Sequence, residues 1–186
     1  EIQRTPEPVY DFTHADRLLD LFAKNGIELQ PCFLNTPGWA VDPDWKPFNP
    51  DLKTRRKTPG VPPPVISHYE NFVEVYMRHF DGRIRFLESW NEPDLLNFAN
   101  FSADTYVEIM KAFHRAIRKA SSTAQVMTGG HTCISLPYPR LTSHPDHMAY
   151  TMERAKGYYD IHAFHAHGPH IHYYPQLYAP TELHRK

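Results

Sequence analysis

The sequence predicts an α/β fold in which strands alternate with helices around a parallel sheet. Three observations lead to this class. Apolar residues recur with helical spacing in several segments, short apolar runs lie between those segments, and Gly-containing turns separate many of them. Regular alternation of strands and helices is typical of βαβ units and of parallel sheets.

The first predicted pair is a helix followed by a buried strand. Thr13 can cap the helix, and Asn25-Gly26 ends it. A short apolar run over 27–34 then predicts the strand. Residues 42–65 contain seven prolines and no periodicity, so we expect a long loop there, of the kind that is usually functional or mobile.

Three further helix–strand pairs follow in the same order. Ser67 and Glu70 have the spacing of a capping box, and Ser102 can cap the next helix. The helices are expected over about 67–80, 102–117 and 148–155, and the strands over 84–90, 126–128 and 160–166.

The order of elements favours a (β/α)8 TIM barrel, and the length indicates that it is incomplete. No Gly-x-Gly-x-x-Gly or P-loop pattern follows a strand, which disfavours a nucleotide-binding sheet. A closed barrel of this class needs about 250 residues, whereas this chain has 186. We therefore expect residues 1–186 to form a single partial barrel domain that holds about strands two to six.

Composition narrows the classes of partner. The formal net charge is -1, which gives no electrostatic case for nucleic acid or an anionic membrane surface. No apolar run approaches the roughly 20 residues that span a bilayer. Cys32 and Cys133 fit no zinc or redox spacing, so they leave both a secreted and a cytoplasmic location open. No cofactor is expected, and the oligomeric state stays open.

Glu92 is the leading candidate for catalysis. It ends the strand predicted over 84–90, where barrel enzymes place their chemistry, and Pro93 stops that strand. The neighbouring Trp90 indole is expected to desolvate the carboxyl group and so favour the protonated form that a general acid needs. Asn91 offers an amide for a sugar hydroxyl. Capping of the next helix by Glu92 is the structural alternative.

The run Trp-Asn-Glu-Pro over 90–93 resembles the signature of the retaining glycoside hydrolases of clan A. The resemblance is closest to family 39, the β-xylosidase and α-L-iduronidase group, or to a relative of family 5. It implies that Glu92 is the acid/base and that Asn91 contacts the 2-hydroxyl of the substrate. Supporting segments are 10–20, 25–27, 36–40, 127–130 and 160–168.

The sequence also departs from the family pattern. Strand six often ends His-x-Tyr in these families, and here His167 occupies the position of the Tyr. The nucleophile belongs on strand seven, and Glu182 follows His167 too closely for a helix to fit between them. The nucleophile is therefore expected outside this chain, and the segment alone is expected to be inactive.

Further candidates surround the expected site. Trp39 follows a strand and can stack on a sugar ring or plug the barrel rim. His131 ends a strand and is expected in the site, with a solvent-facing loop as its alternative. The resemblance makes His165 and His167 rim residues of the sugar site. These two imidazoles share a face and could bind a metal, but no carboxylate partner accompanies them. We therefore predict no metal site.

The function predicted from these residues is retaining hydrolysis of an O-glycosidic bond in a carbohydrate substrate. A non-catalytic, carbohydrate-binding degenerate barrel is the first alternative. A histidine-rich metal-dependent hydrolase is the second. The sugar, the linkage and the choice between exo and endo action are left open.

Overall fold

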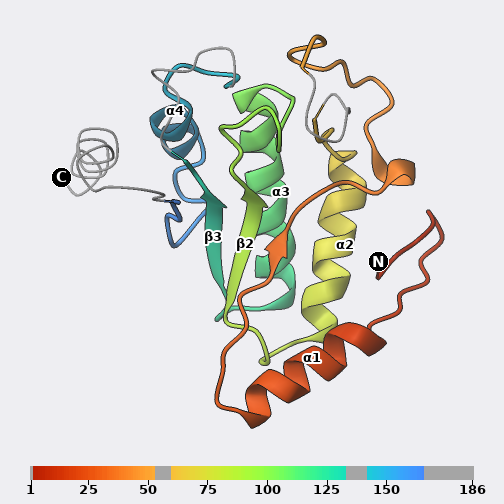
Figure 1. Cartoon of the computed structure of the whole chain (residues 1–186). Coiled ribbons are helices and arrows are strands. Elements are labelled where there is room, and N and C mark those ends of the chain that lie inside the picture. Colours follow the sequence, from red (N-terminus) through yellow and green to blue (C-terminus); the bar gives the residue numbers. More distant parts are fainter. Residues whose placement is uncertain (1, 53–59, 133–141, 166–186) are drawn as a thin grey trace.

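The computed structural model describes residues 2–52, 60–132 and 142–165 and shows a small parallel sheet backed by helices (Figure 1). The sheet has the order β1-β2-β3, and both pairs of strands are parallel. Cys32 pairs with Glu88 at the first junction, and Asn91 pairs with Gly130 at the end of the second. The strands are β1 (Cys32–Phe33), β2 (Phe86–Asn91) and β3 (Gln125–Gly130).

The chain returns beside β3 after the last helix. Ile161 forms a parallel bridge with Met127, and Phe164 forms one with His131. The strand predicted over 160–166 is therefore present only as two isolated bridges over its described residues. The strand predicted over 27–34 is likewise reduced to β1. Parallel pairing and intervening helices confirm the α/β class, but the described residues form an open sheet and not a closed barrel.

Five helical segments accompany the strands within the described residues. Ser102 caps α3 as predicted, because its side chain accepts a hydrogen bond from the Thr105 backbone N–H at 3.1 Å. The capping box predicted at Ser67 is wrong: α2 begins at Ile66 without a side-chain cap, and Glu70 instead pairs with Arg115 of α3. The segments are α1 (Thr13–Lys24), the 3-10 turn η1 (Gly38–Ala40), α2 (Ile66–His79), α3 (Ala103–Ala120) and α4 (His147–Arg154).

The start of α1 also differs from the prediction. The helix already includes Thr13, and its N-cap is Phe12, which supplies no side-chain hydrogen bond. The Asp11 carboxylate instead accepts a hydrogen bond from the Thr13 backbone N–H at 3.1 Å. An acceptor two residues earlier thus takes the place of the predicted cap.

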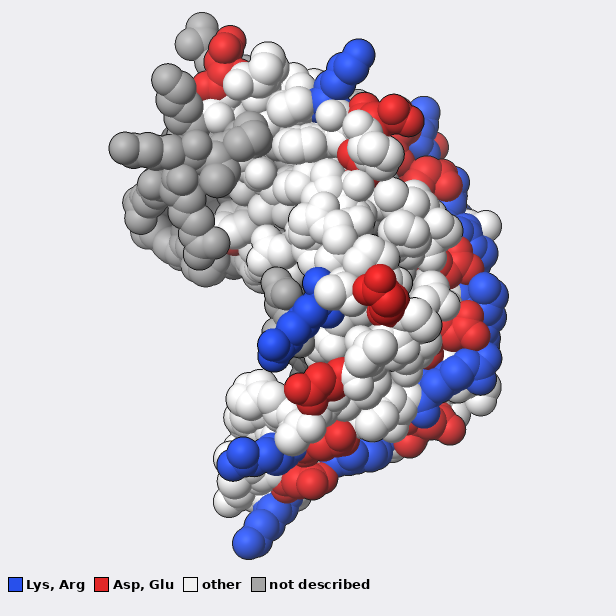
Figure 2. Space-filling model, turned by 90° about the vertical axis from the view of Figure 1, so that its right-hand side faces the viewer, with Lys and Arg blue, Asp and Glu red and all other residues white. Residues whose placement is uncertain are grey.

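Helices α2 and α3 pack against each other and cover one face of the sheet (Figure 1). Their apolar stripes meet Leu87 and Val126 of the strands, which are fully buried. Because strand side chains alternate, Glu88 and Met127 belong to the opposite face. Figure 2 shows charged side chains of both signs along the helical margin and a hollow on the opposite side.

The proline-rich stretch runs irregularly over the described parts of 42–65, as predicted, and residues 53–59 lie outside the description. A bridge between Val41 and Pro64 closes its two ends, and the Thr36 hydroxyl donates to the Pro62 carbonyl at 2.9 Å. The loop is thereby tied to the carboxyl end of β1. None of the helices in the described part is long and apolar enough to cross a membrane.

Candidate active site

Glu92 lies directly after β2, at the carboxyl end of the sheet, where parallel α/β folds bind their ligands. Its backbone has φ 46°, a left-handed conformation that is rare for residues other than glycine. The Glu92 backbone N–H donates to the Gly130 carbonyl at 3.2 Å, which ties the residue to the end of β3. Its side chain is 14% exposed, so the carboxylate is largely withdrawn from solvent without being sealed off.

The imidazole of His165 contacts the Glu92 carboxylate. The imidazole Nδ1 lies 2.9 Å from Glu92 Oε1, and the imidazole is 32% exposed. The backbone N–H of His165 donates to the His131 carbonyl at 2.8 Å, which fixes this segment beside β3. The two predicted site residues are therefore brought together by the pairing of β3 with the segment that follows α4.

Gly130 makes room for this imidazole. A Cβ added at Gly130 would lie 2.4 Å from His165 Nε2 and 2.6 Å from Cδ2, far inside van der Waals contact. The ring thus lies directly over the glycine, and a side chain at Gly130 would have to displace it. Gly129 is confined by backbone, because a Cβ there would lie 2.8 Å from the Ser89 carbonyl oxygen and 2.9 Å from that of Trp90. Backbone packing therefore requires glycine at 129, and Gly130 leaves room for the imidazole.

Glu88 is a buried carboxylate on β2, four residues before Glu92 in the chain. Its Oε1 accepts a hydrogen bond from the Gly130 N–H at 2.9 Å, and its Oε2 accepts one from Gln30 Nε2 at 2.9 Å. The Gly130 residue is therefore held at its N–H by Glu88 and at its carbonyl by the backbone of Glu92. Sequence reasoning missed this link, although the position of Glu88 between the inward-packed Leu87 and Ser89 was a signal for it.

Asp94 fixes the loop that follows Glu92. The side chain is 1% exposed and accepts hydrogen bonds from the Thr132 backbone N–H at 3.0 Å and from the Thr132 hydroxyl at 2.6 Å. The loops after β2 and β3 are thereby joined just beyond the candidate acid. This residue was also missed, because nothing in the local sequence pairs it with Thr132.

His131 lies on a different side of the sheet from the Glu92–His165 pair. It is fully buried, its Nε2 lies 3.3 Å from the Thr151 hydroxyl of α4, and its ring packs beside Tyr106 and His147. Burial lowers the pKa of the His131 imidazole to about 3. Direct contact with a sugar was predicted for His131, but this surrounding gives it a packing role against α3 and α4.

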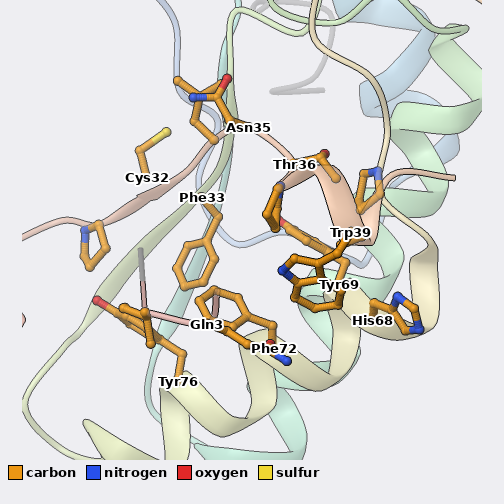
Figure 3. A pocket seen from close by; sticks show the side chains of 16 residues that line it. Gln3, Cys32, Phe33, Asn35, Thr36, Trp39, His68, Tyr69, Phe72 and Tyr76 are labelled. Atoms are coloured by element: carbon orange, nitrogen blue, oxygen red, sulfur yellow. The ribbon is translucent and has the colours of Figure 1, made fainter. Parts of the chain in front are cut away.

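The remaining predicted residues are dispersed around the end of the sheet. Asn91 is the last residue of β2 and is half-buried beside Gly130. Trp39 lies on η1, with its ring 5.6 Å from that of His68, and lines a hollow of about 500 Å³ at the β1 edge. Figure 3 shows this hollow and its aromatic lining. His167 and Glu182 lie outside the described residues.

The Trp90 indole differs in its role from the sequence-based expectation. The side chain is fully buried in the core, its Nε1 donates to the Phe98 carbonyl at 2.8 Å, and its ring packs edge-on against Phe101. The indole thus packs in the core against the loop that precedes α3. Within 2–52, 60–132 and 142–165, no three His, Cys, Asp or Glu side chains gather in a way that could hold a metal ion.

The fold is a parallel α/β sheet, and the candidate site is a half-buried carboxylate at the carboxyl end of that sheet. Comparison with known protein families then identifies the family of this chain. Residues 3–145 match the model of Glycosyl hydrolases family 39, and the chain belongs to that family. No curated protein matches the chain in a sequence search.

Solved structures share this fold at low sequence identity. A family 39 glycoside hydrolase from Bacteroides cellulosilyticus WH2 matches with a TM-score of 0.61 and 14% identity, covering 88% of this chain and 30% of that one. The family 39 enzyme from Xanthomonas axonopodis pv. citri gives 0.56 and 20%, covering 82% and 28%. A family 39 β-xylosidase from Caulobacter crescentus gives 0.55 and 18%, covering 89% and 36%. The chain thus spans about a third of the length of these proteins.

Proposed function

We propose that this chain is part of a (β/α)8 barrel that hydrolyses O-glycosidic bonds with retention, and that Glu92 is its acid/base. The single observation that carries the proposal is the Glu92–His165 pair at the carboxyl end of the sheet. A general acid needs a carboxyl group that is held in place and reachable by substrate. Glu92 meets both needs, and membership of family 39 supports the reaction class.

The proposed reaction has two displacements. Glu92 protonates the leaving oxygen while a carboxylate attacks the anomeric carbon, and Glu92 then removes a proton from the water that releases the sugar. The attacking carboxylate must lie about 5–5.5 Å from Glu92 in such a mechanism. We propose that it comes from chain outside this segment, since the segment spans about a third of its structural neighbours.

The supporting residues have separate proposed roles. Asn91 directs its amide to the 2-hydroxyl of the bound sugar, and Trp39 offers an aromatic face. His165 orients the Glu92 carboxylate through its Nδ1, and His167 completes the rim. His131 stays in the packing layer and stabilises the end of β3 against α4. Specificity for a particular sugar depends on surfaces around these residues, so the test needs a panel of substrates.

The test uses the full-length protein and a panel of 4-nitrophenyl and alkyl glycosides, including xylosides and glucosides. Glu92→Gln should lower kcat/KM about 10²–10⁴-fold on alkyl glycosides, which need a protonated leaving group, and less on 4-nitrophenyl glycosides. Glu108→Gln, on the exposed side of α3, is the matched control. The first sugar anomer released, followed by proton NMR, should retain the configuration of the substrate.

Two results would count against the proposal. Undiminished hydrolysis of alkyl glycosides by Glu92→Gln would remove Glu92 from the acid/base role. Sugar binding without hydrolysis by the wild-type protein would favour the carbohydrate-binding alternative instead.

A further inference from the structure

We infer that Asn35 is a further sugar-binding residue beside Asn91 and Glu92, an inference that rests on the proposed function. Register pairs Phe33 with Ser89, so the chain two residues later runs level with Asn91. The Cys32 thiol donates to the Trp90 carbonyl at 3.3 Å, which shows that β1 stays close to the end of β2.

The backbone of Asn35 is left-handed. Asn35 has φ 69°, and the other described non-glycine residues with positive φ are Trp90 and Glu92. All three lie at the carboxyl ends of two neighbouring strands. Residues in this conformation gather at functional sites, where the surrounding structure holds them. The end of β1 therefore shares the strained geometry of the segment that carries Glu92.

The Asn35 side-chain amide is free to bind a ligand. Asn35 is exposed, and its amide makes no hydrogen bond to any other residue in the described ranges. The neighbouring Thr36 is anchored to Pro62, so the loop is fixed while the amide is left available. An amide has two donors and a carbonyl acceptor, a set that suits a sugar hydroxyl.

Asn35 also borders a hollow. Asn35 lines the hollow of about 500 Å³ that Trp39 also lines, a volume in the range of small-molecule sites. Figure 3 shows Asn35 at the end of the strand, apart from the aromatic rings of Phe33, Tyr69 and Phe72. A polar group thus stands at one margin of an aromatic hollow, on the side of the neighbouring strand end.

A simpler role for Asn35 can be separated by experiment. Asparagine tolerates left-handed φ, so the residue could serve the turn alone. Asn35→Gly keeps this backbone conformation and removes the amide, whereas Asn35→Asp keeps the shape and removes the donors. If Asn35 is needed only for the turn, both variants should keep the wild-type kcat/KM.

Kinetics on the panel glycoside that the wild type cleaves fastest is the first measurement. Both variants should lower kcat/KM about tenfold, with melting temperatures within about 2 °C of wild type. Among deoxy analogues of that glycoside, one should show nearly equal rates for wild type and Asn35→Gly, because its missing hydroxyl is the group bound. Wild-type kinetics in Asn35→Gly, with every analogue, would overturn the inference.

A binding measurement separates this inference from the proposed function. In the Glu92→Gln variant, the Asn35 side-chain NH₂ signals in an ¹⁵N NMR spectrum should shift when methyl β-D-xylopyranoside or methyl β-D-glucopyranoside is added. Shifts without hydrolysis by the wild type would sink the hydrolase proposal and keep Asn35 as a sugar contact. Hydrolysis by the wild type with unmoved Asn35 signals would keep the hydrolase proposal and overturn Asn35 as a sugar contact.

Discussion

The imidazole Nδ1 of His165 lies 2.9 Å from the Oε1 atom of Glu92, although the two residues are 73 positions apart in the chain. Strand pairing produces this contact. Phe164 bridges to His131, and the His165 N–H donates to the His131 carbonyl, while the Glu92 N–H donates to the Gly130 carbonyl. Both functional side chains are therefore positioned from successive residues at the end of β3.

Removing the imidazole should weaken catalysis without abolishing it. A hydrogen bond to a charged group contributes about 1.5–3 kcal/mol, so His165→Ala should lower kcat/KM about 10- to 100-fold. If the imidazole acts through the carboxylate, the double variant Glu92→Gln/His165→Ala should be no slower than Glu92→Gln alone. Additive losses in this cycle would show that His165 acts separately from Glu92.

A side chain at Gly130 should displace the imidazole. Gly130→Ala puts a methyl group 2.4 Å from His165 Nε2, so the ring must move away from Glu92. A misplacement of about 1 Å can cost about 10²-fold in rate, and we expect a loss of kcat of that size with a lowered melting temperature.

Two controls accompany the Gly130 variant. Gly38→Ala has nothing within 4 Å of the added Cβ and should behave as wild type. Adding His165→Ala to Gly130→Ala should restore the melting temperature but not the rate, since it removes the clash and the contact together. An active, stable Gly130→Ala protein would contradict the packing account.

Glu88 should stabilise the end of β3. Glu88→Gln replaces one accepting oxygen by an NH₂ group, which cannot accept from the Gly130 N–H or the Gln30 amide. Leaving one buried donor unpaired costs about 1–3 kcal/mol, which urea unfolding would measure. Glu108→Gln, which is exposed on α3, supplies the control. Equal unfolding free energies for the two variants would mean that the Glu88 hydrogen bonds contribute nothing.

Acid should destabilise the fold through buried histidine. Burial lowers the pKa of His131 to about 3, and it also lowers that of His147, whose side chain is fully buried. In the unfolded chain an imidazole titrates near about 6.5. Between these values the unfolded state binds more protons, so the unfolding free energy falls as pH drops from about 6.5 toward 3.

The size of this effect is measurable. His131 alone should remove about 2 kcal/mol of stability between pH 7.5 and pH 5. Urea unfolding of His131→Gln should show a correspondingly smaller loss over this range, whereas His14→Gln, at an exposed position of α1, should keep the wild-type loss. A pH dependence unchanged by His131→Gln would refute the assignment.

Sequence patterns determined the parts of this protein that depend on local physics. Helical stripes and short apolar runs placed the four long helices and the central strands, because burial of an apolar face shows as periodicity. A strand stopped by Pro93 placed Glu92 at the edge of the sheet, and the resemblance of Trp-Asn-Glu-Pro to the clan A signature marked it as the candidate acid. Boundaries were less predictable, as Phe12 and Val65 show, because caps depend on a few atoms.

Only the tertiary structure decided which of the predicted residues meet. His131 and His165 look alike in sequence, since each lies near the end of a strand, yet the first packs against α4 and the second reaches Glu92. The side of the sheet on which a residue lies depends on alternation and local twist, and left-handed residues such as Trp90 and Glu92 interrupt that alternation. The links through Gly130 and Asp94 join positions about 40 residues apart, so pairing register creates them and no local pattern can.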